Sequence, residues 1–178
     1  MDFIKNTWKN NSNNIWLVIL RLTLGLEWFM AGLHKLLDPT YIPGIGGTIG
    51  FFGSAGNPNL WFQNVATNVF LTNPEVFGWL ISVGELLVGV AFIFGALLNF
   101  AALAGVFMNL LFYFAAGWLS ASTQSINWIM AILTLVLLIS TGSKALSVDL
   151  FVAKKLEKPW LHRLLVDWFN IDKWLNKK

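Results

Sequence analysis

Four apolar stretches, each close to the length of a bilayer crossing, restrict the folds open to this chain of 178 residues. They run from about Ile15 to Leu37, Val76 to Leu98, Phe100 to Leu119 and Ile126 to Thr141. A helix needs roughly 20 apolar residues to cross the hydrocarbon core of a membrane. Because 56% of the residues are hydrophobic and only 12% are charged, a soluble fold is excluded. The sequence therefore predicts an all-α membrane protein, a four-helix transmembrane bundle.

A long connection and a long tail accompany the predicted bundle. We expect residues 1–145 to form the bundle, with a long outer loop at residues 38–75, and residues 146–178 to form an amphipathic interfacial tail. The loop contains a Gly-rich stretch at residues 44–56, which predicts either an anion-binding nest of N–H groups or a surface loop packed over the bundle. A short interfacial helix is expected at residues 59–71. Pro159 divides the tail into two predicted helices.

Basic residues are distributed unevenly along the chain. No Lys or Arg occurs between Asp38 and Ser125, whereas both ends of the sequence are rich in them. Positively charged segments stay on the cytoplasmic side, so we expect a multi-pass plasma-membrane protein with both termini in the cytoplasm. The basic tail then lies beside the lipid bilayer, either as an anchor or as a docking segment for a partner subunit. Nucleic acid is not expected as a partner.

The supply of metal-binding side chains is small. The sequence has no cysteine and two histidines, which excludes an iron–sulfur cluster and thiol chemistry within this chain. A haem held by two facing histidines is equally hard to build. We expect no metal or haem in this chain, so a redox role would use a diffusible cofactor or a partner's metal.

Ionisable residues lie inside the first two apolar stretches. Arg21 and Glu27 fall within the first, His34 and Lys35 lie near its far end, and Glu85 is in the middle of the second. A charge at the bilayer centre costs about 2.5–3.5 kcal/mol on insertion scales, so such residues usually pair or serve a site. The function of this chain is therefore expected in a polar interior.

Helical periodicity sorts these residues into stripes. Arg21, Trp28 and Lys35 fall on one stripe of the first helix, and Glu27 and His34 form a second. The other helices each offer small residues with isolated polar groups: Gly78, Ser82, Glu85 and Gly89; Gly105, Asn109 and Ala116; Asn127, Ala131, Thr134 and Thr141. Small residues with isolated polar groups are typical of helix contacts in membranes, so we expect these stripes to face inward.

Several interpretations of the charged residues stay open. We expect Arg21 to contact Glu85, Glu27 or both, either as a helix-locking ion pair or with Glu27 left as a proton-carrying carboxylate. Lys35 either extends toward the interface or forms, with His34, a positive mouth for an anion. Trp28 is either core packing or one wall of an aromatic slot. The candidate catalytic residues are Glu27, His34 and Glu85, and the candidate substrate-binding residues are Arg21, Lys35 and Trp28.

An ordered set of glycines and charges resembles the DoxX superfamily, and most closely its DoxD family. The set comprises Arg21-x3-Gly25, Ala31-Gly32-x2-Lys35-Leu36 and Glu85-x3-Gly89-x5-Gly95. The resemblance implies a four-helix membrane subunit of thiosulfate:quinone oxidoreductase, which oxidises thiosulfate to tetrathionate and reduces a quinone. It also implies a DoxA-like partner subunit and association with a terminal quinol oxidase. It supplies no catalytic residues, so those named above rest on the chemistry of the side chains.

Three functions are consistent with these features. We expect an oxidoreductase with quinone as its diffusible electron acceptor and thiosulfate as its substrate. The alternative is a non-catalytic accessory subunit of a terminal quinol oxidase complex, in which the polar interior only pairs helices. A small transporter is the third, but the sequence shows neither an inverted repeat nor a broken helix.

Overall fold

A computed structural model describes residues 14–140 and 142–168. Four helices are long and apolar enough to cross a membrane: α2 (Ile15–Leu37), α5 (Pro74–Phe94), α6 (Leu98–Ala116), which the 3-10 turn η3 (Gly117–Leu119) extends, and α7 (Ala121–Ile139). No strand occurs in these two described ranges. The predicted all-α fold is therefore confirmed, and the chain is a multi-pass membrane protein.

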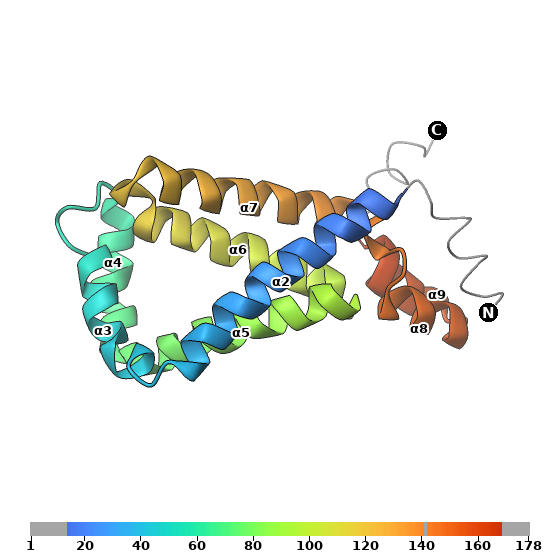
Figure 1. Ribbon diagram of the computed structural model, residues 1–178, viewed down its shortest axis with the longest axis horizontal. Coiled ribbons are helices and arrows are strands. Elements are labelled where there is room, and N and C mark those ends of the chain that lie inside the picture. Colours follow the sequence, from blue (N-terminus) through green and yellow to red (C-terminus); the bar gives the residue numbers. More distant parts are fainter. Residues whose placement is uncertain (1–13, 141, 169–178) are drawn as a thin grey trace.

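The four long helices form two antiparallel pairs, α2 with α5 and α6 with α7. The pairs lie close together where the C-terminal segment begins and spread apart at the opposite end, where two shorter helices connect them (Figure 1). We call these the tail end and the capped end. The widening at the capped end is the feature that positions the candidate site.

Local signals set the helix boundaries. Proline occupies the first turn of α5, where its missing N–H is not needed, and α5 ends at Gly95, which has a φ of +69° that favours glycine. Helix α7 begins five residues earlier than the predicted Ile126, because the Ser120 side chain accepts a hydrogen bond from the Thr123 N–H and caps it. Thr141, the predicted end of this span, lies outside the described residues.

The predicted loop at residues 38–75 is largely helical. It contains α3 (Tyr41–Phe52), α4 (Leu60–Asn68) and the 3-10 turn η2 (Phe70–Thr72). Ile45 and Ile49 are buried against α4, which supports a helix through the glycines. The predicted anion nest is wrong, because most N–H groups of the Gly-rich stretch are committed to α3. The short helix expected at residues 59–71 is present as α4.

A buried asparagine connects the two short helices α3 and α4, which we call the cap, to the bundle. The Asn57 side-chain amide donates hydrogen bonds to the carbonyl oxygens of Phe52 (2.8 Å) and Phe114 (2.9 Å). Its Oδ1 accepts a hydrogen bond from the Asn59 N–H at 2.9 Å. Since Phe114 belongs to α6, these bonds hold the turn between α3 and α4 against a spanning helix.

Glycines of the resemblance motif lie where α2 and α5 touch. A Cβ at Gly32 would lie 2.5 Å from the backbone nitrogen of Leu86, and a Cβ at Gly89 would overlap the backbone of Phe29. Any side chain at either position would push the two helices apart. The close approach that small residues allow is what joins helices in a membrane.

The tail packs against the tail end of the bundle. It contains the 3-10 turn η4 (Gly142–Lys144), α8 (Val148–Leu156), α9 (Pro159–His162) and the π-helical turn η5 (Arg163–Asp167). Asp149 accepts hydrogen bonds from the N–H groups of Leu97 and Leu98, both at 2.8 Å, and so caps α6. Pro159 starts a second tail helix, as predicted. The predicted tail beyond Trp168 lies outside the described residues.

Candidate functional site

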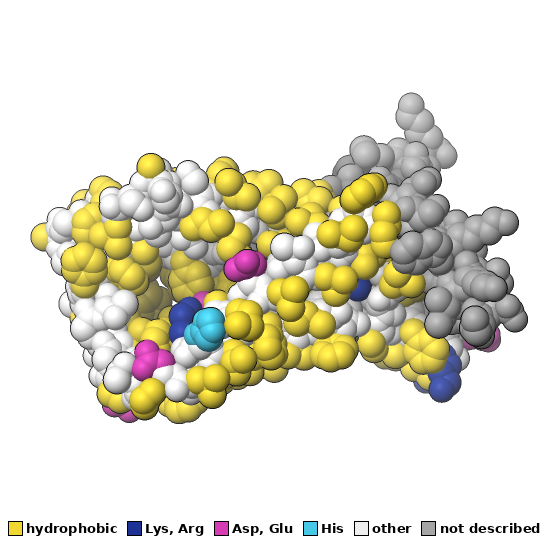
Figure 2. Space-filling model, in the orientation of Figure 1, with side chains coloured by type: hydrophobic (Ala, Val, Ile, Leu, Met, Phe, Trp, Pro, Cys, Tyr) yellow, Lys and Arg dark blue, Asp and Glu magenta, His cyan; other side chains and the backbone are white. Residues whose placement is uncertain are grey.

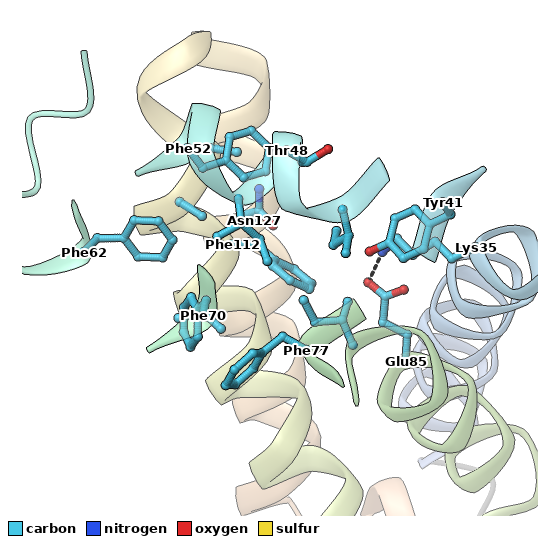
Figure 3. Close-up of a pocket in the computed structure, with 16 residues that line it drawn as sticks. Lys35, Tyr41, Thr48, Phe52, Phe62, Phe70, Phe77, Glu85, Phe112 and Asn127 are labelled. Carbon is cyan, nitrogen blue, oxygen red and sulfur yellow. Dashed lines mark hydrogen bonds and ion pairs between the residues drawn. The ribbon is translucent and has the colours of Figure 1, made fainter. Parts of the chain in front are cut away.

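An ion pair between two spanning helices marks the candidate site. Lys35 Nζ on α2 contacts Glu85 Oε1 on α5 (Figure 3). The Glu85 side chain is 3% exposed and the Lys35 side chain 27% exposed, so the carboxylate is enclosed and the ammonium lies partly open. The ammonium is also 5.9 Å from the Tyr41 ring centroid and 5.5 Å from that of Phe112. Aromatic faces at these distances stabilise a cation.

The pair lies on the wall of a cavity of about 410 Å³ at the capped end. Aromatic and aliphatic side chains from α3, α4, η2, α5 and α6 make up most of the lining: Tyr41, Ile45, Ile49, Phe52, Phe62, Phe70, Phe77, Ile81, Leu111 and Phe112. Thr48 and Asn127 add polar groups. The space-filling view shows this hollow, with Lys or Arg (dark blue), His (cyan) and acidic (magenta) side chains beside it (Figure 2). An apolar cavity with a few converging polar groups is typical of a site for a small organic molecule.

A phenol completes the polar part of the cavity. Tyr41 begins α3, and its hydroxyl points toward Lys35 and Glu85 (Figure 3). Burial and, second, the negative charge of Glu85 raise the pKa of Tyr41 to about 12. The phenol therefore keeps its proton at neutral pH. The cavity wall thus offers an ammonium, a carboxylate and a hydroxyl to one polar group of a ligand.

Arg21 does not reach either carboxylate. Its guanidinium donates hydrogen bonds to the carbonyl oxygens of Ser143 (2.7 Å), Ala145 (3.0 Å) and Leu146 (3.2 Å). The predicted contact of Arg21 with Glu85 or Glu27 is therefore wrong. The contact does not form because Arg21 lies at the tail end, where the carbonyl groups after α7 are closer than the carboxylates. Arg21 fastens the tail to α2.

The two predicted stripes of α2 face in different directions. Trp28 is 2% exposed and belongs to the core, where its ring centroid lies 6.5 Å from that of Phe112. Glu27 and His34 are exposed on the other face of α2. Glu27 is thus not an interior carboxylate, and Trp28 packs in the core behind Phe112 instead of lining the cavity. Of the six candidate residues, the structure brings together Lys35 and Glu85.

Comparison with known proteins supports one assignment. The profile of a family described as "TQO small subunit DoxD" matches residues 16–170, which covers all four spanning helices and most of the tail. The chain belongs to the DoxD family. No match was found among the curated proteins or the solved structures. Membership of the DoxD family is consistent with a role as an oxidoreductase subunit. A small subunit implies a partner subunit.

Sequence reasoning missed Tyr41, Phe112 and the cavity of this DoxD-family chain. Phe112 follows Asn109 by one turn on α6, so the polar stripe of that helix was a usable signal. Tyr41 carried no signal, because its position depends on α3 being a helix. In the described part of the chain, no group of three His, Cys, Asp or Glu side chains is arranged to hold a metal ion.

Proposed function

We propose that this chain is the membrane subunit of a thiosulfate:quinone oxidoreductase and that the quinone ring binds in the cavity of the capped end. The single observation that carries the proposal is the cavity of about 410 Å³, in which an apolar, aromatic lining meets the Lys35–Glu85 pair. A quinone has a flat apolar ring and two carbonyl oxygens. The lining suits the ring, and the Lys35 ammonium with the Tyr41 hydroxyl suits one oxygen.

The net reaction balances with two protons. Two thiosulfate ions lose two electrons and form tetrathionate, and the quinone takes up two electrons and two protons to become a quinol. Lys35 would stabilise the negative charge that develops on the quinone oxygen, and Glu85 would pass protons to it. In the sequence, Lys35 is the one Lys or Arg between Arg21 and Lys144. It is therefore the cation that would also attract thiosulfate to the cavity.

A covalent route accounts for the electron transfer. The terminal sulfur of thiosulfate attacks the quinone ring, forms a C–S bond, and one oxygen of the adduct takes up a proton. A second thiosulfate attacks that sulfur; the new S–S bond gives tetrathionate, and the electron pair of the broken C–S bond stays on the ring as a quinol anion. A second proton completes the quinol. Holding the reactants together would supply much of the rate.

The proposal includes an orientation in the membrane. Lys144, Lys154, Lys155, Lys158 and Arg163 lie at the tail end, whereas Lys35 is the one Lys or Arg at the capped end, since residues 38–125 contain neither. The positive-inside rule then puts the tail end in the cytoplasm and the cap outside. A dianion arriving from outside would meet the cavity first.

A photoreactive short-chain quinone tests the binding site. The purified protein, with and without its partner subunit, is irradiated with the probe, and the labelled peptides are mapped by mass spectrometry. Labels within residues 41–52 and 111–116, prevented by excess unmodified quinone, would support the proposal. Thiosulfate-dependent loss of quinone absorbance in the same samples tests the reaction. Absence of both labelling and turnover would favour the accessory-subunit alternative.

A further inference from the structure

Six buried side-chain nitrogen or oxygen atoms have no hydrogen-bond partner within the described residues. Two of them, Arg21 Nε and Asn99 Oδ1, lie at the tail end, and the other four come one from each spanning helix. These four are Trp28 Nε1 on α2, Glu85 Oε2 on α5, Asn109 Nδ2 on α6 and Thr134 Oγ1 on α7. Their residues are 2%, 2%, 1% and 0% exposed, respectively. We call them the central polar group. A buried polar atom without a partner is costly, and four of them in one small bundle need an explanation.

The four residues lie within about two helical turns of one another. A Cβ at Gly105 would lie 3.2 Å from Thr134 Cγ2, 3.6 Å from Val88 Cγ1 and 3.7 Å from Trp28 Cζ2, so all four helices meet at this level. Asn109 is one turn from Gly105 toward the capped end, and Glu85 is about one turn from Val88 in the same direction. The central polar group therefore occupies adjacent levels on the bundle axis.

The chemistry of these atoms is mixed. The Trp28 indole and the Asn109 amide donate hydrogen bonds, the Glu85 oxygen accepts them as a carboxylate, and the Thr134 hydroxyl does both. An ion would satisfy only the donors or only the acceptors. A water molecule donates and accepts, and buried water typically makes about three hydrogen bonds to such groups.

We propose that the central polar group binds ordered water, which connects Glu85 by hydrogen bonds to the other three spanning helices. The water lies behind Phe112, whose ring is between the cavity and Trp28, since it lines the cavity and lies 6.5 Å from the Trp28 ring. Toward the tail end, the site is closed by core side chains that include Leu24, Phe92 and Leu137. The two carboxylate oxygens thus have separate partners, Lys35 for one and water for the other.

This water site stands independently of the proposed function. Its consequence for that function is that Glu85 has a solvated oxygen on the side turned away from Lys35. A buried carboxylate in a salt bridge needs its remaining lone pairs satisfied if it is to stay charged. The water supplies those bonds.

Radiolytic footprinting of the wild-type protein tests the proposal directly. An X-ray pulse converts bound water into hydroxyl radicals, which oxidise the side chains next to that water. We expect Trp28 to be oxidised several-fold faster than Phe92, which is 0% exposed in the same core and has no polar atom. Oxidation of Trp28 no faster than that of Phe92 would overturn the proposal. Loss of Trp28 oxidation when a short-chain quinone is added would also overturn the proposal, since the quinone would then fill the site.

A substitution series gives a second, independent measurement. Thr134→Val removes a hydroxyl at constant shape. If water is bound, the variant loses a hydrogen bond and its melting temperature falls by a few degrees. If the site is dry, removal of an unpaired hydroxyl leaves the melting temperature unchanged or raises it, which would contradict the proposal. Thr23→Val, on the exposed face of α2, is the matched control and should change nothing. Neither readout requires quinone reduction, so failure of the proposed function would leave both interpretable.

Discussion

Lys35 and Glu85 form an ion pair between two antiparallel spanning helices whose backbones come into contact at Gly32, one turn away from Lys35. The pair faces a cavity that is otherwise apolar. Gly32 and Gly89 allow α2 and α5 to approach closely, which keeps the backbone positions of the two charged residues near each other. The pair is thus both a connection between helices and the charged wall of the proposed quinone site.

Substitutions at the pair separate these two roles. Lys35→Met leaves a buried carboxylate without its partner, and breaking a buried pair typically costs about 3–5 kcal/mol. The double variant Lys35→Met/Glu85→Leu removes both charges, so we expect it to regain most of that stability. Quinone reduction should fall at least about tenfold in both variants, since one catalytic interaction of this kind is worth that much or more. Thermal unfolding and quinone absorbance measure the two effects.

Glu27→Gln is the matched control for these variants. Glu27 is on the same helix as Lys35 but is exposed, away from the cavity. We expect its unfolding temperature and its rate of quinone reduction to equal those of the wild type. Full activity in the double variant, together with reduced activity in Glu27→Gln, would place the catalytic carboxylate at Glu27, as first expected from the sequence.

Arg21 supports a prediction about the tail. Arg21→Leu removes the donor of three hydrogen bonds and leaves the carbonyl groups of Ser143, Ala145 and Leu146 without it. A hydrogen bond to a charged group contributes about 1.5–3 kcal/mol, so the free energy of unfolding of the variant should fall by more than about 2 kcal/mol. Limited proteolysis should cut the variant faster between Gly142 and Val148. The KM for quinone should stay constant in folded protein, because Arg21 is at the opposite end from the cavity.

Helical periodicity predicted which faces turn inward more reliably than it predicted contacts. The stripe of Arg21, Trp28 and Lys35 faces the interior, and the interior stripe of α5 is buried at Ser82, Glu85 and Gly89. These positions follow from the 100° rotation per residue and from small residues at helix contacts. The pairing of Lys35 with Glu85 did not follow, because it depends on the relative shift of α2 and α5.

The cap was the least predictable part of the fold. A stretch of glycines has a low intrinsic helix propensity, so residues 44–56 were expected to be irregular. In the structure, Ile45 and Ile49 pack against Phe62 and Ala66, and this tertiary packing outweighs the propensity of the glycines. The cavity depends on that packing and therefore could not be seen in the sequence.

Lys144 should make stability depend on pH. It lies just after α7, and burial lowers its pKa to about 8 although Asp149 and Asp167 act in the opposite direction. Between the folded pKa of about 8 and the ordinary lysine pKa of 10.5, the unfolded chain binds more protons than the folded one. Stability therefore rises with pH in this interval, by about 2 kcal/mol between pH 7.5 and 9.5. Chemical unfolding at several pH values checks this, and Lys144→Met should remove the dependence.

Single introduced cysteines test the orientation, since the sequence has no cysteine of its own. Ala55→Cys in the cap and Lys158→Cys in the tail both change exposed residues. A membrane-impermeant maleimide applied to sealed cells should label Ala55→Cys and spare Lys158→Cys, and both should react after the cells are opened. The reverse pattern in sealed cells would put the cap in the cytoplasm and contradict the proposed entry of thiosulfate from outside.

Filling the cavity should block quinone binding without touching the ion pair. Ala116 lines the cavity at the end of α6, and leucine there adds three carbon atoms to a space of about 410 Å³. We expect Ala116→Leu to keep or slightly raise the unfolding temperature, because cavity-filling substitutions commonly stabilise a fold. Photolabelling of residues 41–52 by the quinone probe should fall, and the KM for quinone should rise at least about tenfold, the factor that 1.4 kcal/mol of lost binding gives. Ala104→Leu, on the exposed face of the same helix, is the matched control and should leave both unchanged. Equal labelling in the two variants would place the quinone outside the cavity.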